Sequence, residues 1–150
     1  AIRTDQYLYI KNFIPSRWPV GNPEYGLLNC DNSPTKSHLI SLKGDQKMGN
    51  YYQMSFGKRP EEELYNIIED PDCFVNLADN INYSKIKDSL WQSLKTKLVK
   101  QKDPRILGKG EIFDFYPYSR IPRQQKLYND PNYDPIKIFE DKYNQKINVN

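Results

Sequence analysis

The chain has 150 residues, 37% of them hydrophobic and 27% charged, which suits one domain with a hydrophobic core. Its 22 basic and 19 acidic residues give a net charge of +3, a balance that argues against a nucleic acid or an acidic membrane as the ligand. No apolar run approaches the roughly 20 residues of a membrane-spanning helix, and the 20 aromatic residues (12 Tyr, 6 Phe and 2 Trp) indicate a large half-buried surface.

Residues 1 to 13 are predicted to form a β-hairpin. Residues 2 to 4 and 7 to 13 are rich in β-branched and aromatic side chains, and the polar pair between them suits a tight turn. The chain begins without methionine and inside this apparent strand. We therefore expect it to be a piece of a longer polypeptide.

Residues 14 to 57 are predicted to form an irregular loop and then two short helices. The loop carries three prolines and two glycines without periodicity, and long loops of this kind are usually functional or held against another surface. Ser33 suits a helix N-cap and Pro34 the first helical position, where its missing N–H is not needed. Gly44 suits the end of that helix, and residues 51 to 56 are interpreted as a second helix.

The clearest periodic patterns lie between residues 63 and 102. Leu64 and Tyr65 fall on opposite faces of a strand predicted over residues 63 to 67, and Asp70, which precedes a proline, predicts a turn. A long amphipathic helix is predicted over residues 82 to 102. Its apolar residues recur every four positions and are expected to pack on a sheet: Ile86, Leu90, Leu94 and Leu98.

The last third of the chain is less regular. Prolines and aromatic residues interrupt residues 104 to 133, and a final helix is predicted over residues 135 to 147 with Asp134 as its N-cap. Together the elements predict an α+β fold. It consists of a small antiparallel β-sheet with a long amphipathic C-terminal helix packed on it, plus irregular loops and short helices.

The sequence lacks the common catalytic motifs. It has no Gly-rich phosphate loop, no Gly-x-Ser-x-Gly and no His-Glu-x-x-His, and with one histidine and no Cys-x-x-Cys it predicts no zinc site. Cys30 and Cys73 either form a disulfide in an exported protein or serve as small buried hydrophobic residues. The run from Glu61 to Glu63 is interpreted as part of a solvated turn. We therefore predict no catalytic and no metal-binding residue in this chain.

Two basic regions have a binding and a structural interpretation. Lys58 and Arg59 precede a proline and can hold an oxyanion such as sulfate, because the arginine fork matches oxyanion geometry; the alternative is a solvated basic turn. His38 is either a surface or hydrogen-bonded residue or a catalytic one.

The segment "EEELYNIIEDPDCFVNLAD" (residues 61 to 79) resembles a signature near the C-terminus of the formylglycine-dependent sulfatases. In that signature a Glu-Leu-Tyr strand, an Asp-Pro turn and an Asn-Leu-Ala segment lead into the last long helix. "IRTDQYLYIKNF" resembles the preceding hairpin of the family. "NSPTKSHLISL" and "DPRILGKGEIF" resemble the bacterial type of the N-sulfoglucosamine sulfohydrolase (heparan N-sulfatase) branch.

The resemblance implies a sulfatase C-terminal subdomain over residues 1 to 115 and a C-terminal extension over residues 116 to 150. The family nucleophile lies in a Cys/Ser-x-Pro/Ala-x-Arg motif and becomes formylglycine, yet Cys30 begins "CDNSP" and Cys73 begins "CFVNL". Formylglycine, calcium and the catalytic Lys and His are therefore expected in a missing N-terminal α/β domain of the same polypeptide. That parent is expected to be a periplasmic or secreted enzyme acting on sulfated glycans, with this chain closing one side of the substrate pocket.

In this interpretation the substrate contacts come from loops and short helices, because the sheet and the long helix are used for packing. Basic side chains would bind the anionic groups, and an aromatic ring would stack on the sugar. The candidates are Arg59, Lys58, His38, Arg17 and Trp18. Two alternatives stay open: a stand-alone carbohydrate-binding module that uses Trp18, Tyr25 and Tyr51, or a structural or interaction domain.

Overall fold

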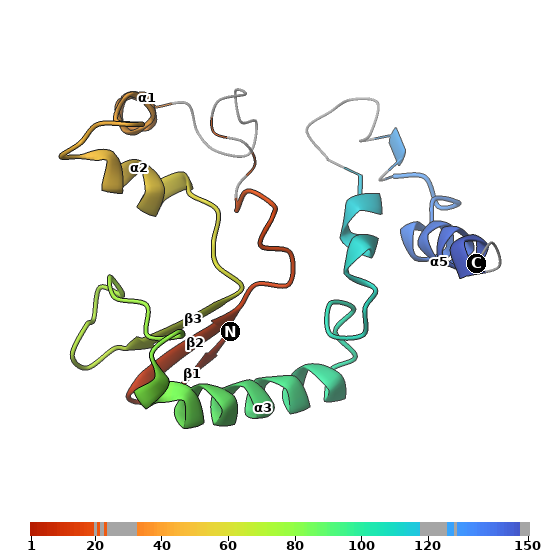
Figure 1. Ribbon diagram of the computed structural model, residues 1–150. Helices are drawn as coiled ribbons and strands as arrows, with labels where there is room; N and C mark the ends of the chain where they lie inside the picture. The colour runs from red at the N-terminus through yellow and green to blue at the C-terminus, as the bar shows by residue number, and fades with distance from the viewer. Residues whose placement is uncertain (20, 22, 24–32, 118–125, 128, 148–150) are drawn as a thin grey trace. The chain divides into compact units, whose positions relative to one another are not determined.

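The computed structural model describes all residues except 20, 22, 24–32, 118–125, 128 and 148–150 (Figure 1). The chain divides into two compact units, Ala1–Ser93 and Leu94–Asn150, which are described separately. The described part contains a small sheet and several helices, so the α+β class is confirmed. None of its helices has the length and apolar character needed to cross a membrane.

The sheet has three antiparallel strands in the order β1-β2-β3. These are β1 (Ile2–Arg3), β2 (Tyr7–Lys11) and β3 (Glu62–Asn66). The predicted hairpin is confirmed, and the Thr4 hydroxyl holds its turn by accepting the Tyr7 N–H at 2.9 Å. Tyr9 on β2 pairs with Leu64 on β3, and both side chains are fully buried at the centre of the core.

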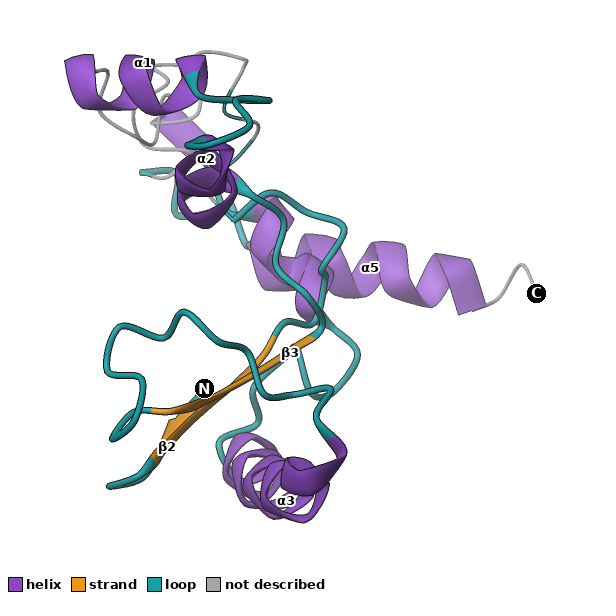
Figure 2. Cartoon of the chain, turned by 60° about the vertical axis from the view of Figure 1, so that its left-hand side comes forward, coloured by secondary structure: helices purple, strands orange, loops and turns teal. Residues whose placement is uncertain are grey.

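The long helix packs on one face of this sheet. It is observed as α3 (Ser84–Lys100), directly preceded by the 3-10 helix η1 (Ile81–Tyr83), and Figure 2 shows it next to the sheet, viewed nearly along the helix axis. The Trp91 ring lies 6.4 Å from that of Tyr9 and 6.5 Å from that of Phe13, between centroids. Leu90 is buried as the apolar stripe requires.

Two short helices precede β3, as predicted: α1 (Pro34–Ser41) and α2 (Gly49–Phe56), which pack against each other. The Ser33 hydroxyl accepts the Lys36 N–H at 3.1 Å, and proline occupies the first turn, so the predicted N-cap is confirmed. The helix ends three residues before Gly44, whose φ of 81° lies in the region that favours glycine.

The second unit contains the 3-10 helix η2 (Gly110–Phe115) and the helix α5 (Pro135–Ile147). Phe115 contacts the buried Phe139 edge to face, with ring centroids 5.9 Å apart. The Asp134 carboxylate accepts the N–H groups of Ile136 and Lys137 at 2.9 and 3.1 Å. This confirms the predicted cap and the predicted bounds of the last helix.

Candidate functional site

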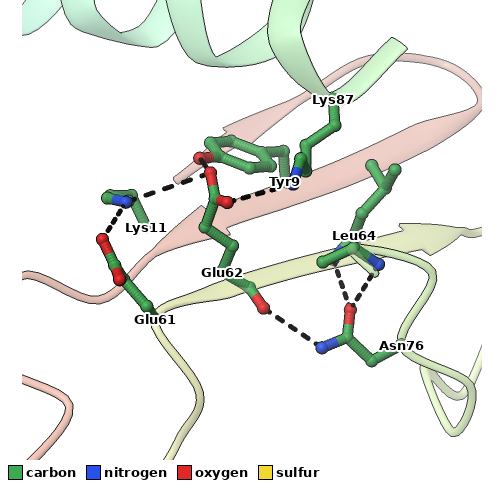
Figure 3. A network of polar contacts seen from close by, with 8 residues as sticks. Tyr9, Lys11, Glu61, Glu62, Leu64, Asn76 and Lys87 are labelled. Atoms are coloured by element: carbon green, nitrogen blue, oxygen red, sulfur yellow. Dashed lines mark hydrogen bonds and ion pairs between the residues drawn. The ribbon is translucent and has the colours of Figure 1, made fainter. Parts of the chain in front are cut away.

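Glu61 and Glu62, the first two residues of the acidic run, form a polar network with β2 and α3 (Figure 3). The Glu62 carboxylate accepts the Tyr9 hydroxyl at 2.6 Å and the Lys87 ammonium at 3.1 Å. Lys11 lies 3.9 Å from the same carboxylate and 2.6 Å from that of Glu61. Glu62 thus connects its own strand to β2 and to α3.

The contact between Tyr9 and Glu62 shifts the pKa values of both residues. Burial, and then the hydrogen bond to Glu62, raises the pKa of Tyr9 above its ordinary value. The pKa of Glu62 is lowered, first by the hydrogen bond from Tyr9 and then by the hydrogen bond from Lys87 and the charge of Lys11. These effects outweigh its partial burial, which raises the pKa. Tyr9 therefore stays neutral and Glu62 stays ionised, as suits a structural clamp.

Glu63 points to the opposite face of β3 from Glu62 and is buried. It accepts the Asn12 side-chain amide at 2.8 Å and the Tyr65 hydroxyl at 2.7 Å. Burial, and then this bond, raises the pKa of Tyr65. The interpretation of Glu61 to Glu63 as solvated turn residues is therefore wrong for Glu62 and Glu63, although it holds for the exposed Glu61.

The Asn-Leu-Ala segment covers the outer edge of β3. The Asn76 side chain accepts the N–H groups of Leu64 and Ala78 at 2.9 and 3.0 Å and donates to the Glu62 carbonyl at 3.1 Å (Figure 3). The Leu77 N–H donates to the Leu64 carbonyl at 2.7 Å. Because β3 is an edge strand, this segment satisfies backbone groups that would otherwise be unpaired.

Asp70 holds the turn between β3 and the Asn-Leu-Ala segment. Its carboxylate accepts the Val75 N–H at 2.8 Å, which confirms its predicted role. Cys73 within the turn has a φ of 57°, and burial raises the pKa of its free thiol. Cys30 lies outside the described residues. Glu62, Glu63, Asp70 and Asn76 of this segment therefore hold the local structure together.

The structure brings two of the candidate binding residues together. The Lys58 ammonium lies over the Trp18 ring, 5.3 Å from its centroid, and Lys58 is exposed while Trp18 is half-buried. This arrangement is a cation–π contact between the irregular loop and the segment that leads into β3. It places a positive charge over one face of an indole ring.

The other three candidates are placed differently. The Arg59 guanidinium donates to the Met54 carbonyl at 2.8 Å in the last turn of α2, where a basic group satisfies a helix-end carbonyl. Arg17 is exposed at a turn closed by its own N–H and the Ile14 carbonyl, 3.1 Å apart. His38 is exposed on α1, and within the described part of the chain no contact joins it to Lys58 or Trp18.

The described residues also place two buried polar groups that the sequence did not single out, Lys36 on α1 and Tyr52 on α2. The sequence does not indicate that either group is buried without a partner. A lysine is usually a surface residue, and a tyrosine in a helix is an ordinary core aromatic. No group of three or more His, Cys, Asp or Glu residues suited to a metal ion occurs among the described residues.

Comparison with known proteins gives one informative relative. No family model and no solved structure matches the chain. An ulvan-active sulfatase of Formosa agariphila is 28% identical over 138 residues, which cover 91% of this chain and 20% of the relative. The chain thus spans about a fifth of the length of the curated relative that it matches. The chain is related to a sulfatase.

Proposed function

We propose that this chain is the non-catalytic C-terminal part of a sulfatase that removes sulfate from sulfated glycans, where it closes one side of the substrate pocket. The observation that carries the proposal is the alignment of nearly the whole chain with a fifth of a sulfatase. The network around Glu62 and Asn76 supports it, because these signature residues are used for packing and for strand pairing.

The substrate contacts in this proposal come from the Lys58–Trp18 pair. An ammonium group attracts a sulfate group, and an indole stacks on the apolar face of a sugar ring. The connection that carries Lys58 is restrained: a Cβ at Gly57 would lie 2.5 Å from the Gln53 carbonyl oxygen, and the following Arg59 is fixed to Met54. Arg59 therefore acts mainly by positioning Lys58, and Arg17 and His38 remain proposed contacts.

The catalytic groups would belong to an N-terminal α/β domain of the same polypeptide. The described residues do not fit calcium, since Glu62 and Glu63 are already engaged by hydrogen bonds and no suitable acidic cluster is present among them. They do not fit formylglycine either, because Cys73 begins Cys-Phe-Val-Asn-Leu. We accordingly expect the 150-residue chain alone to give no turnover of a chromogenic aryl sulfate. We also propose a periplasmic or secreted location for the parent.

Two classes of sulfated saccharide are candidate substrates of the longer polypeptide. The sequence segments at residues 32 to 42 and 103 to 113 favour an N-sulfoglucosamine sulfohydrolase-like activity, whereas the relative is named for activity on ulvan. Assaying the longer polypeptide on an N-sulfated glucosamine saccharide and on an ulvan oligosaccharide separates them. Preference for the first supports the branch assignment, and preference for the second contradicts it.

The pocket role is tested with Lys58→Met in the longer polypeptide. Losing one charge-assisted contact to sulfate should lower kcat/KM for a sulfated oligosaccharide by about tenfold or more. Turnover of a small aryl sulfate, which reaches only the catalytic centre, should stay unchanged. Lys47→Met, which removes an exposed lysine of the same charge, is the matched control. Equal losses on both substrates, or no loss on either, contradict the proposal.

A stand-alone carbohydrate-binding module is the second candidate, favoured by the Lys58–Trp18 contact. Tyr51 is exposed and available for stacking, while Tyr25 lies outside the described residues. Replacing Trp91 with Phe leaves Trp18 as the single tryptophan, so its fluorescence reports binding of a sulfated oligosaccharide to the isolated chain. Saturable quenching that weakens with salt supports this candidate, and its absence excludes it.

A further inference from the structure

The helix pair α1–α2 contains two buried polar groups without a hydrogen-bond partner. Lys36 is 8% exposed and Tyr52 is 2% exposed. Neither the Lys36 ammonium nor the Tyr52 hydroxyl has a partner among the residues that the structure describes. A buried ammonium is costly unless it is paired, so this position points to an anionic partner.

The surroundings of the Tyr52 side chain supply little compensation for its unpaired hydroxyl. Tyr52 packs against the buried Phe56, with ring centroids 5.7 Å apart, and Leu42 between the helices is also buried. The Lys43 ammonium lies 5.9 Å from the centroid of the Tyr52 ring. The Tyr52 hydroxyl thus lies in apolar surroundings, where an unpaired polar group is costly and a bound oxyanion would satisfy it.

The charge of the segment points the same way. Residues 33 to 58 carry one acid, Asp45, against four lysines: Lys36, Lys43, Lys47 and Lys58. Asp45 is engaged locally, because its Oδ1 accepts the N–H groups of Met48 and Lys47 at 2.7 and 2.8 Å, and these bonds lower its pKa. Lys36 also lies in the first turn of α1, where the helix dipole is positive.

We infer that the α1–α2 pair contains an oxyanion-binding site in which Lys36 provides the charge and Tyr52 a hydroxyl donor. The ligand is the sulfo group of a sulfated saccharide, and this identification of the saccharide rests on the proposed function. Thr35 and Ser37, which flank Lys36 on α1, are exposed, so the site lies close to the protein surface. This site is separate in sequence and in its residues from the Lys58–Trp18 pair.

The test is thermal unfolding of the 150-residue chain in sodium sulfate against sodium chloride of equal ionic strength. Sulfate should raise Tm along a saturable curve, since a ligand that binds the folded state stabilises it. Lys36→Met should abolish the saturable part while keeping the apolar stem. Lys47→Met, which removes an exposed lysine between the same helices, should keep it.

Sulfate also stabilises proteins by exclusion from their surface, and this effect does not depend on Lys36. Equal Tm shifts in the unchanged chain and in Lys36→Met would therefore overturn the inference, as would the absence of a saturable shift in the unchanged chain. Acetate at the same ionic strength should give a smaller shift, and an equal one would overturn the assignment to a sulfo group.

Tyr52→Phe is the second variant and retains Lys36. It should weaken the apparent sulfate affinity by about tenfold, the effect of one hydrogen bond to a charged group. Unchanged affinity would overturn the role of Tyr52. None of these measurements uses Lys58, Trp18 or a saccharide, so failure of the oxyanion site and failure of the proposed function give different results.

Discussion

The Tyr9 hydroxyl donates a 2.6 Å hydrogen bond to the Glu62 carboxylate, although the two residues are 53 positions apart in the chain. Tyr9 belongs to the central strand of the sheet and Glu62 to an edge strand, and the same carboxylate accepts Lys87 of α3. One acidic side chain therefore holds three elements together. Because the bond joins a neutral donor to an ionised acceptor, it is stronger than a neutral pair and depends on pH.

Glu62 should contribute to the loss of stability in acid. Its folded-state pKa is lowered, first by the Tyr9 hydrogen bond, so its contribution is present above the unfolded pKa of about 4.3 and is lost as pH falls through the folded value. Urea unfolding at pH 7 and pH 3 measures this. Glu62→Gln should lower the free energy of unfolding by about 1–2 kcal/mol at pH 7. It should also reduce the further loss of stability between pH 7 and pH 3.

The control for Glu62 is Glu61→Gln. Both residues pair with Lys11, but the Glu61 side chain is 67% exposed against 26% for Glu62. Exposed ion pairs contribute little to stability, so the Glu61 variant should lose under about 1 kcal/mol of unfolding free energy at pH 7. Its loss of stability between pH 7 and pH 3 should match that of the unchanged chain. Equal pH profiles for the two variants would contradict the assignment of the clamp to Glu62.

Tyr9 and Tyr65 should ionise late in an alkaline titration. The pKa of each is raised, first by burial and then by a hydrogen bond to Glu62 or Glu63. Their contribution to stability is full below the unfolded pKa of about 10 and is lost as pH rises toward the folded value. In an ultraviolet titration, Tyr9→Phe and Tyr65→Phe should each remove one tyrosine from the group that ionises only on alkaline unfolding.

The sequence predicts those elements whose causes are local. Ser33 and Asp134 each accept N–H groups two or three residues ahead, so both caps can be recognised without knowledge of the fold. The periodic stripe of α3 is similarly local, and its buried Leu90 agrees with the pattern. Non-local partners are different: Glu62 reads as a surface acid because Tyr9 and Lys87 are 53 and 25 positions away.

The candidate site shows the same division. The sequence predicts Lys58 and Trp18 as binding residues independently of each other, and their contact depends on the path of an irregular loop that no periodicity encodes. The role of Arg59 had a local signal, since a basic residue just after a helix commonly binds its last carbonyls. The burial of Lys36 had none, because it results from how α1 packs, and lysine is rarely buried.

Asn76→Ala should destabilise the chain strongly, because Asn76 makes three hydrogen bonds that cover the edge of β3. Losing them should cost about 2–4 kcal/mol in chemical denaturation. Asn76→Asp keeps the acceptor for the Leu64 and Ala78 N–H groups but cannot donate to the Glu62 carbonyl. The stability of Asn76→Asp should therefore lie between that of the unchanged chain and that of Asn76→Ala. An alanine variant as stable as the unchanged chain would show that solvent replaces these bonds.

Leu94→Ala should remove a well-buried side chain from the stripe of α3. Leu94 is 4% exposed, and truncating a buried leucine costs about 2–5 kcal/mol through lost transfer energy and the cavity that remains. Val99→Ala on the same helix is the matched control, because Val99 is 48% exposed. It should cost under about 1 kcal/mol, since surface substitutions away from such features have small effects. Urea titration of both variants measures the difference. A loss below about 1 kcal/mol for Leu94→Ala would mean that the stripe does not face a packed core, because the cavity left in a packed core lowers stability by more than that.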